Sequence, residues 1–185
     1  VCRAFKKLEL VIQVSREIVK KPHKLIVLKG QNAHEDIEKA FKSHKYHYKL
    51  DWLTQVTHFI QQQLTLYPKL AVVGDFNVAP EDRDVHDPAE WLGGVHVSPA
   101  ERQAFGDLLR LGLHDSFRNF EQSNGHFSWW DYRAAGFRRN RGLRIDHVLL
   151  SHELNDLCLQ SVIDKEPRKA ERPSDHTPVW VELNL

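Results

Sequence analysis

Residues 70–77 read LAVVGDFN, and this stretch decides the fold class. Its first four residues, 70–73, form a short apolar run that Gly74 ends, which is typical of a buried β-strand. Before it, apolar residues recur every three or four positions over 50–64, which predicts an amphipathic helix ending near Tyr67-Pro68. A helix followed directly by a buried strand indicates a fold that mixes the two kinds of element.

A second helix and two further strands are expected after this unit. Ser98-Pro99-Ala100-Glu101 supplies an N-cap, a proline at the first helical position and a capping-box acid, and Gly112 ends the pattern, so a helix is expected over 99–111. Residues 143–151 are strand-like, and 177–185 alternate apolar and polar side chains. Interspersed helices and strands predict an α/β or α+β class.

Weaker signals surround these elements. Residues 1–21 have a loose helical spacing, 25–28 form an apolar run of strand length, and Gly30-Gln31-Asn32 predicts a turn after it. The acidic, proline-containing stretch 79–88 is expected to be a loop. We find no internal repeat, so no repeat architecture is expected.

Composition excludes some classes of protein. The positive charges of 26 Lys and Arg nearly cancel the negative charges of 25 Asp and Glu, so the net charge of +1 does not by itself indicate a nucleic-acid partner. Cys2 and Cys158 have no zinc or redox spacing, and no stretch resembles a membrane span or signal peptide. We therefore expect a soluble, cytoplasmic, monomeric protein. Because the chain begins at Val1 and contains no Met, we also expect that its original N-terminus is missing or was processed away.

Asp75 and Asn77 follow the buried strand and lie two residues apart. In extended backbone both side chains project from the same side of the strand end. A carboxylate and an amide oxygen suit a hard cation, so we expect Mg²⁺ here, with Mn²⁺ as the alternative ion. The competing interpretation is an Asx turn, in which both side chains bond local backbone.

Asp146 lies inside the apolar strand predicted over 143–151. An acid at a strand centre is costly unless something pairs with it. One interpretation is a salt bridge to Arg144 or Arg141. The other is a hydrogen bond from His176, which would hold the imidazole ready to meet phosphate.

Asp175 and His176 stand just before the last strand, where both side chains could reach the edge that carries Asp75. A capped loop is the competing interpretation of this pair. Together with Asn77 and Asp146, these residues make an oxygen-rich site beside an imidazole, as metal-assisted phosphodiester hydrolysis needs. We predict that Asp75, Asn77, Asp175 and His176 converge on one cleft.

Residues 129–144 interleave aromatic side chains with five arginines. Such a loop can stack on bases and grip phosphates. The competing interpretation is a solvated basic loop packed by its own aromatic rings. The arginines are Arg133, Arg138, Arg139, Arg141 and Arg144.

Four motifs occur in the order GDFNVAP (74–80), FSWWDYR (127–133), NRGLRID (140–146) and PSDH (173–176). Together they resemble the exodeoxyribonuclease III family of the endonuclease/exonuclease/phosphatase superfamily. The resemblance covers residues 45–185 and implies the C-terminal catalytic half of a two-sheet α/β sandwich, with residues 1–44 unmatched. It implies a Mg²⁺-dependent DNA-repair hydrolase of phosphodiester bonds. Its partner would be double-stranded DNA, which it would degrade 3′ to 5′ and incise at abasic sites.

The resemblance also implies roles for single residues. Asp75 would activate the attacking water, and Asn77 would orient the phosphate and help to hold metal. Asp146 would pair with His176, which would stabilise charge on the phosphoryl oxygens. The implied metal ligands are Asp75, Asn77, Asp175 and His176, and the implied DNA contacts are Trp129, Asp131, Arg133 and Arg141.

Residues 1–44 lack three features of that family: an Asn-x-Asn-Gly motif, a Gln-Glu pair whose Glu is a principal metal ligand, and a catalytic Tyr. One hypothesis is an active nuclease in which another chain, Glu35 or Glu38 supplies the ligand. A second is a catalytically inactive remnant that binds duplex DNA. A third is a relative acting on a small phosphoester, against which the Trp-Trp-Asp-Tyr-Arg stretch argues.

Overall fold

The computed structural model describes residues 25–28, 45–120 and 123–185. A four-stranded sheet with the order β1-β2-β6-β3 lies at its centre. β1 (Leu25–Leu28), predicted as a strand, runs parallel to β2 (Ala71–Asp75). β6 (Asp146–Ser151) runs antiparallel to both β2 and β3 (Leu113–Asp115). The end of β2 therefore meets the beginning of β6.

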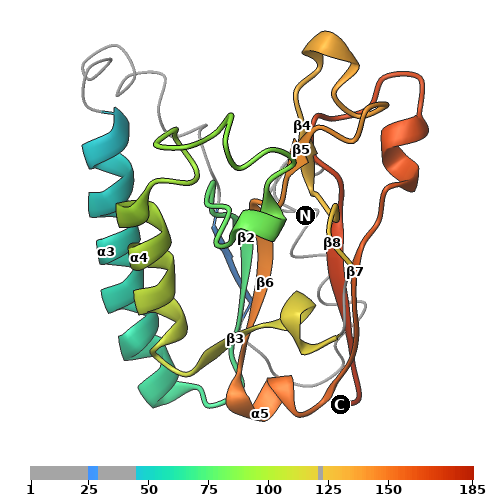
Figure 1. Cartoon of the computed structure of the whole chain (residues 1–185). Helices are drawn as coiled ribbons and strands as arrows, with labels where there is room; N and C mark the ends of the chain where they lie inside the picture. The colour runs from blue at the N-terminus through green and yellow to red at the C-terminus, as the bar shows by residue number, and fades with distance from the viewer. Residues whose placement is uncertain (1–24, 29–44, 121–122) are drawn as a thin grey trace.

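Two helices cover one face of this sheet (Figure 1). α3 (Lys45–Leu66) and α4 (Pro99–Leu109) confirm the two helices predicted from the sequence. α4 begins on the expected capping box, since Ser98 accepts a hydrogen bond from the Glu101 N–H and Glu101 accepts one from the Ser98 N–H. The buried core between helices and sheet includes Leu53, Val56, Ile60, Val72, Phe105, Leu108 and Leu149.

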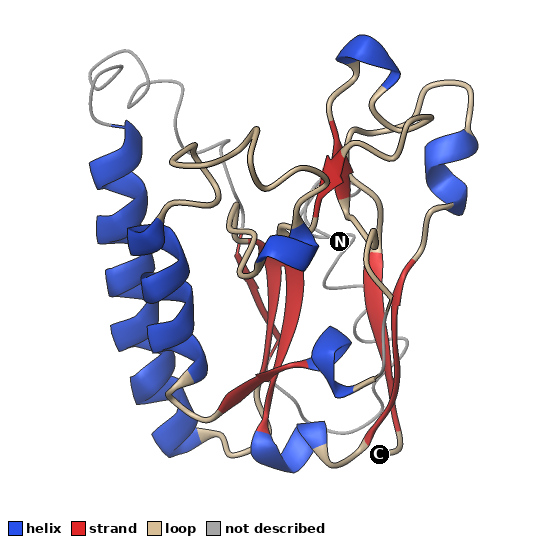
Figure 2. Ribbon diagram, in the orientation of Figure 1, coloured by secondary structure: helices blue, strands red, loops and turns tan. Residues whose placement is uncertain are grey.

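A two-stranded sheet lies against the other face (Figure 2). β7 (Cys158–Ile163) pairs antiparallel with β8 (Val179–Leu183), which confirms the last predicted strand. The second core lies between the two sheets and includes Phe117, Val148, Leu150, Leu154, Ile163 and Val179. Helices, the central sheet and a second sheet thus form the mixed α/β arrangement that was expected.

Short elements complete the fold. β4 (Trp129–Trp130) pairs antiparallel with β5 (Gly142–Leu143), and the loop between them contains η3 (Arg133–Ala135). The predicted loop 79–88 contains one turn of 3₁₀-helix. This turn is η1 (Asp82–Asp84), and the other short helices are η2 (Ser116–Asn119), α5 (His152–Asn155) and η4 (Glu166–Lys169).

The single strand predicted over 143–151 is wrong, because the chain changes sheets within it. The N–H groups of Ile145 and Asp146 both donate to Ser128 Oγ at 3.0 Å, and the Arg144 N–H donates to the Asp84 carbonyl. These bonds satisfy the backbone N–H groups at the point where the chain passes from β5 to β6. Asp146 is consequently the first residue of the interior strand β6 and does not lie at a strand centre.

The predicted end of β2 at Gly74 is also wrong, since the strand continues to Asp75 and Gly74 pairs with both Leu28 and His147. Among the helices of the described part, none is long and apolar enough to cross a membrane. The helix predicted over 1–21, the turn at 30–32, Glu35 and Glu38 all lie outside the described residues.

Candidate metal centre

The antiparallel pairing of β2 with β6 brings two acids together. Asp75 ends β2, Asp146 begins β6, and the two residues are register partners. His176 joins them from the segment before β8, where it forms an isolated β-bridge with Trp129 of β4. All three side chains are buried, and one ligand atom from each lies within 4.8 Å of the others.

The imidazole of His176 links the two carboxylates. Its Nδ1–H donates to Asp146 Oδ2 at 2.8 Å, which confirms the predicted hydrogen bond. Nδ1 must carry the proton because an ionised carboxylate only accepts. Nε2 lies 3.9 Å from Asp75 Oδ2. Asp146 therefore fixes the ring so that its second nitrogen is on the Asp75 side.

Asn77 is held in the left-handed backbone region, with φ of 56°. Its N–H donates to Asp75 Oδ1 at 3.0 Å, so the Asx turn offered as the competing interpretation is present beside the acid cluster. Its carbonyl accepts from His96 Nδ1 at 2.7 Å and from the Lys49 ammonium, which also pairs with buried Glu101. These contacts compensate for a conformation that few non-glycine residues adopt.

Asp175 is not part of the cluster of Asp75, Asp146 and His176 found among the described residues. Its Oδ2 accepts a hydrogen bond from Trp129 Nε1 at 3.0 Å. The predicted convergence therefore holds for Asp75 and His176, which lie together with Asp146, whereas Asp175 lies outside this cluster.

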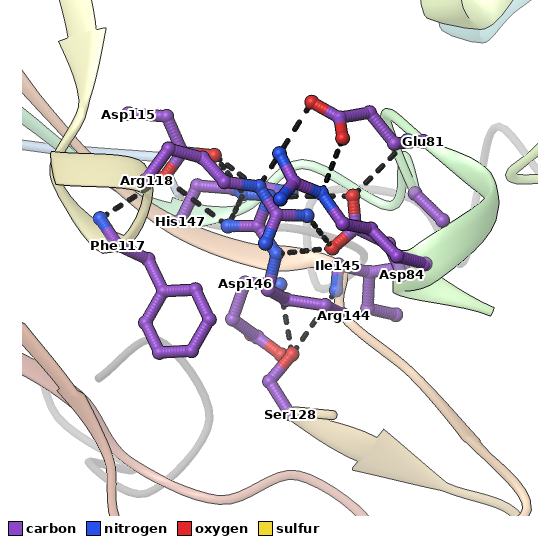
Figure 3. A network of polar contacts seen from close by, with 12 residues as sticks. Glu81, Asp84, Asp115, Phe117, Arg118, Ser128, Arg144, Ile145, Asp146 and His147 are labelled. Atoms are coloured by element: carbon purple, nitrogen blue, oxygen red, sulfur yellow. Dashed lines mark hydrogen bonds and ion pairs between the residues drawn. The ribbon is translucent and has the colours of Figure 1, made fainter. Parts of the chain in front are cut away.

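A buried ionic network lies directly beside Asp146 (Figure 3). Arg144 is 1% exposed and donates from Nε to Asp84 Oδ1 at 2.6 Å and from Nη2 to Asp115 Oδ2 at 2.7 Å. Arg141 pairs with Glu90. A salt bridge from either arginine to Asp146, the alternative interpretation of that acid, is therefore wrong.

The network shifts the pKa of both acids that pair with Arg144. Burial alone would raise the pKa of Asp84 and Asp115, but the charge and hydrogen bonds of Arg144, together with the charge of Arg118, lower both. Burial and the repulsion of the Arg144 charge together lower the pKa of His147 to about 4. The neutral His147 ring accepts from Arg144 at Nδ1 and donates from Nε2 to the Val78 carbonyl at 2.9 Å. The ring thereby ties β6 to the loop that carries Asn77.

The predicted DNA-contacting loop is built on β4 and β5. The Arg133 side chain is 87% exposed and forms an ion pair with Asp131 at 2.6 Å. Trp129 is half-buried. Arg138 and Arg139 are exposed, whereas Arg144, counted with them in the sequence, is buried in the network and cannot reach a phosphate.

Sequence reasoning missed the partners that hold these groups in place. Ser128 was quoted within a motif, but its role in accepting two backbone N–H groups had no local signal. For Arg144 a signal existed, because a charged residue in an apolar run needs a buried counter-charge. The two acids that supply this counter-charge, Asp84 and Asp115, could not be predicted from the residues near Arg144 in the sequence.

Comparisons with known proteins agree with this geometry. A model described as the Endonuclease/Exonuclease/phosphatase family matches residues 8–176. Exodeoxyribonuclease III of Haemophilus influenzae is 36% identical over 146 residues, covering 75% of this chain and 55% of the relative. The exodeoxyribonuclease of Bacillus subtilis is 33% identical over 141 residues, covering 75% of this chain and 53% of its own. The chain thus spans about half the length of the curated relatives it matches.

Solved structures give the same match in three dimensions. The 3′ phosphatase NExo from Neisseria, bound to a product DNA hairpin, has a TM-score of 0.76 and 43% identity, covering 77% of this chain and 56% of that one. An AP endonuclease from Archaeoglobus fulgidus has a TM-score of 0.73 and 34% identity, covering 78% of this chain and 57% of its own.

Proposed function

The chain belongs to the endonuclease/exonuclease/phosphatase family, and we propose that it carries the catalytic half of a Mg²⁺-dependent DNA-repair phosphodiesterase. The substrate is double-stranded DNA with abasic sites or 3′-end lesions. The reaction is hydrolysis of a phosphodiester bond, as 3′ to 5′ removal of nucleotides and as incision at abasic sites. The similarity of the chain to an exodeoxyribonuclease III and to an AP endonuclease supports both activities.

One observation carries the proposal: the buried group of Asp75, Asp146 and His176 at the meeting point of β2 and β6. Carboxylate oxygens are the ligands that Mg²⁺ prefers, and Mn²⁺ accepts the same set. Asp75 fits such an ion best, with Asn77 beside it. When bound, the cation would polarise a phosphate oxygen and offset its charge.

The remaining steps, which are proton transfer, stabilisation of charge and orientation of the phosphate, fall to protein side chains. Asp75 accepts the proton of the water that attacks phosphorus, while the bond from phosphorus to the 3′ oxygen breaks. Asp146 holds His176 at Nδ1, and when the ring is protonated at both nitrogens, Nε2 donates a hydrogen bond to a phosphoryl oxygen. Asn77 orients the phosphate. Asp175 accepts a hydrogen bond from the Trp129 indole and so links the segment that carries His176 to the DNA-contacting loop.

A second candidate function is duplex DNA binding without turnover. It is supported by the exposed arginines of the loop, because contacts to phosphate need no metal. It is also supported by residues 1–44, whose sequence lacks the family's Gln-Glu pair. Loss of one electrostatic contribution of that kind costs about 10² to 10³ in rate. We therefore expect turnover far below that of a complete family member.

The test is incision of an abasic duplex by the purified chain with Mg²⁺, with binding measured in parallel. Asp75→Ala removes the proposed base, and Asp156→Ala, an exposed carboxylate beyond α5, is the matched control. We expect slow incision that Asp75→Ala abolishes and Asp156→Ala leaves intact. Binding without incision at any Mg²⁺ or Mn²⁺ concentration would favour the second function. Hydrolysis of a small phosphoester without DNA binding would contradict both.

A further inference from the structure

Arg168 has an unusual environment for an arginine in a short surface helix. It belongs to η4, yet it is 5% exposed. Its guanidinium carbon lies 5.0 Å from the ring centroid of Phe137, 5.6 Å from Tyr132 and 5.7 Å from Trp130. All three rings come from β4 and the loop that follows it, which is the proposed DNA-contacting loop.

Among the residues that the structure describes, the guanidinium packs against these three rings. Its Nε and Nη1 are buried and have no hydrogen-bond partner among the residues that the structure describes. Burying such donors without compensation is costly. Ring faces within about 6 Å of a cation supply that compensation through their negative quadrupole, more strongly when water is excluded. Arg168 and the three rings therefore form a closed cation–π cluster.

The cluster lies next to the segment that carries His176. Tyr132 donates from its hydroxyl to the Pro173 carbonyl at 2.9 Å, and the Trp130 N–H donates to the Asp175 carbonyl at 2.9 Å. Trp130 and Phe137 also meet edge to face at 5.0 Å. Two hydrogen bonds, one from Tyr132 and one from Trp130, thus connect the loop to the segment before β8.

We propose that Arg168 is a positioning residue for DNA recognition, a cation–π clamp that holds the loop 129–137 in the conformation that meets the duplex. The inference rests on the proposed DNA-directed function and assigns a residue to that function's substrate contacts. Arg168 itself touches no DNA, since its guanidinium is buried beneath the rings. It acts through the loop, which presents Trp129 and Arg133.

Three variants separate this role from simple support of the fold. Arg168→Met keeps the apolar stem and removes the cation, and Arg168→Lys keeps a cation but loses the planar face. Lys169→Met is the control: it makes the same charge change at the next residue, which is exposed and paired with Glu166. Far-UV circular dichroism of each variant checks that it folds.

The first readout needs no DNA. Hydrogen exchange followed by mass spectrometry should be faster across residues 129–141 in Arg168→Met and unchanged across β2 and β6, because the guanidinium packs on rings of β4 and the loop that follows it. Arg168→Lys should restore part of the protection. Unchanged exchange in the loop of a folded Arg168→Met chain would overturn the proposal whatever the chain does to DNA.

The second readout is binding and incision of an abasic duplex. Arg168→Met should weaken binding by about ten-fold, the size of one desolvated cation–π contribution, and Arg168→Lys by less. KM should rise while kcat changes by less than about three-fold, because Asp146 still holds His176. Loss of kcat with unchanged binding would contradict the positioning role. If wild type neither binds nor cuts DNA, the proposed function fails. Faster hydrogen exchange in the loop of Arg168→Met would then show that Arg168 holds the loop in place but has no role in DNA recognition.

Discussion

Replacing Arg144 with Met removes the cation between two buried acids and should destabilise the chain severely. Arg144 donates to both oxygens of Asp115, at 3.1 and 2.7 Å, and from Nε to Asp84. Met fills similar volume but carries no charge and no donor. The substitution therefore leaves two carboxylates that burial alone would not tolerate in ionised form.

The expected loss follows from what each acid keeps. Asp84 retains the charge of Arg118, whose Nη2 pairs with its Oδ1. Asp115 retains the Phe117 N–H at 3.3 Å. Breaking one buried ion pair costs about 3 to 5 kcal/mol. With Arg118 still present, we expect about 4 kcal/mol, a large share of the roughly 5 to 15 kcal/mol that stabilises a domain.

The assay is urea unfolding at pH 7.5 and at pH 5, with exposed Arg138→Met as the charge-matched control. In wild type, Arg144 holds the pKa of Asp84 and Asp115 below the ordinary value, so their contribution is present above the unfolded pKa and lost only as pH falls through the folded one. In the variant, uncompensated burial raises both pKa values. The acids then take up protons on mild acidification, and the gap to wild type should narrow at pH 5.

Two results would refute this reasoning. One is a loss below about 1 kcal/mol at pH 7.5, which is the ordinary cost of a point mutation. The other is a gap that is equal at both pH values, because that would place the cost in lost packing and not in the orphaned charges. Adding Asp115→Asn to the variant should recover part of the loss.

Three further outcomes are expected. Asp146→Asn should lower single-turnover incision by about 10- to 100-fold while leaving duplex binding unchanged, because the amide no longer fixes His176 in one orientation; equal incision by the variant would remove the dyad from the mechanism. Mg²⁺ at 100 times its Kd should stabilise the chain by about 2.7 kcal/mol, seen as a raised Tm, and Asp75→Ala should abolish the shift; a shift of equal size in that variant would locate the ion elsewhere. Asn77→Gly should keep the stability of wild type but lose incision, whereas Asn77→Ala should also cost about 1 kcal/mol, since the position has φ of 56°; retained incision in the folded glycine variant would exclude the amide.

Several features depended on neighbouring residues and were therefore predictable. The spacing of Leu53, Val56 and Ile60 requires a helix with one buried face, and the capping box at Ser98 sets where α4 begins. The apolar run before Asp75 gives β2. The pairing of Asp146 with His176 was predictable because a strand acid needs a partner and the family resemblance supplied one.

Other features were decided by tertiary structure alone. Arg144 pairs with acids 29 and 60 residues away, and the choice between them and Asp146 depends on how the chain turns at Ile145 onto Ser128. That His176 belongs to the acid cluster and its neighbour Asp175 does not depends on the path of the chain before β8. The sequence alone thus determined the helices α3 and α4, the strands β2 and β8, the family and the kinds of side chain at the site. Which of those side chains meet was decided by sheet register and packing, because contacts between distant segments have no local pattern.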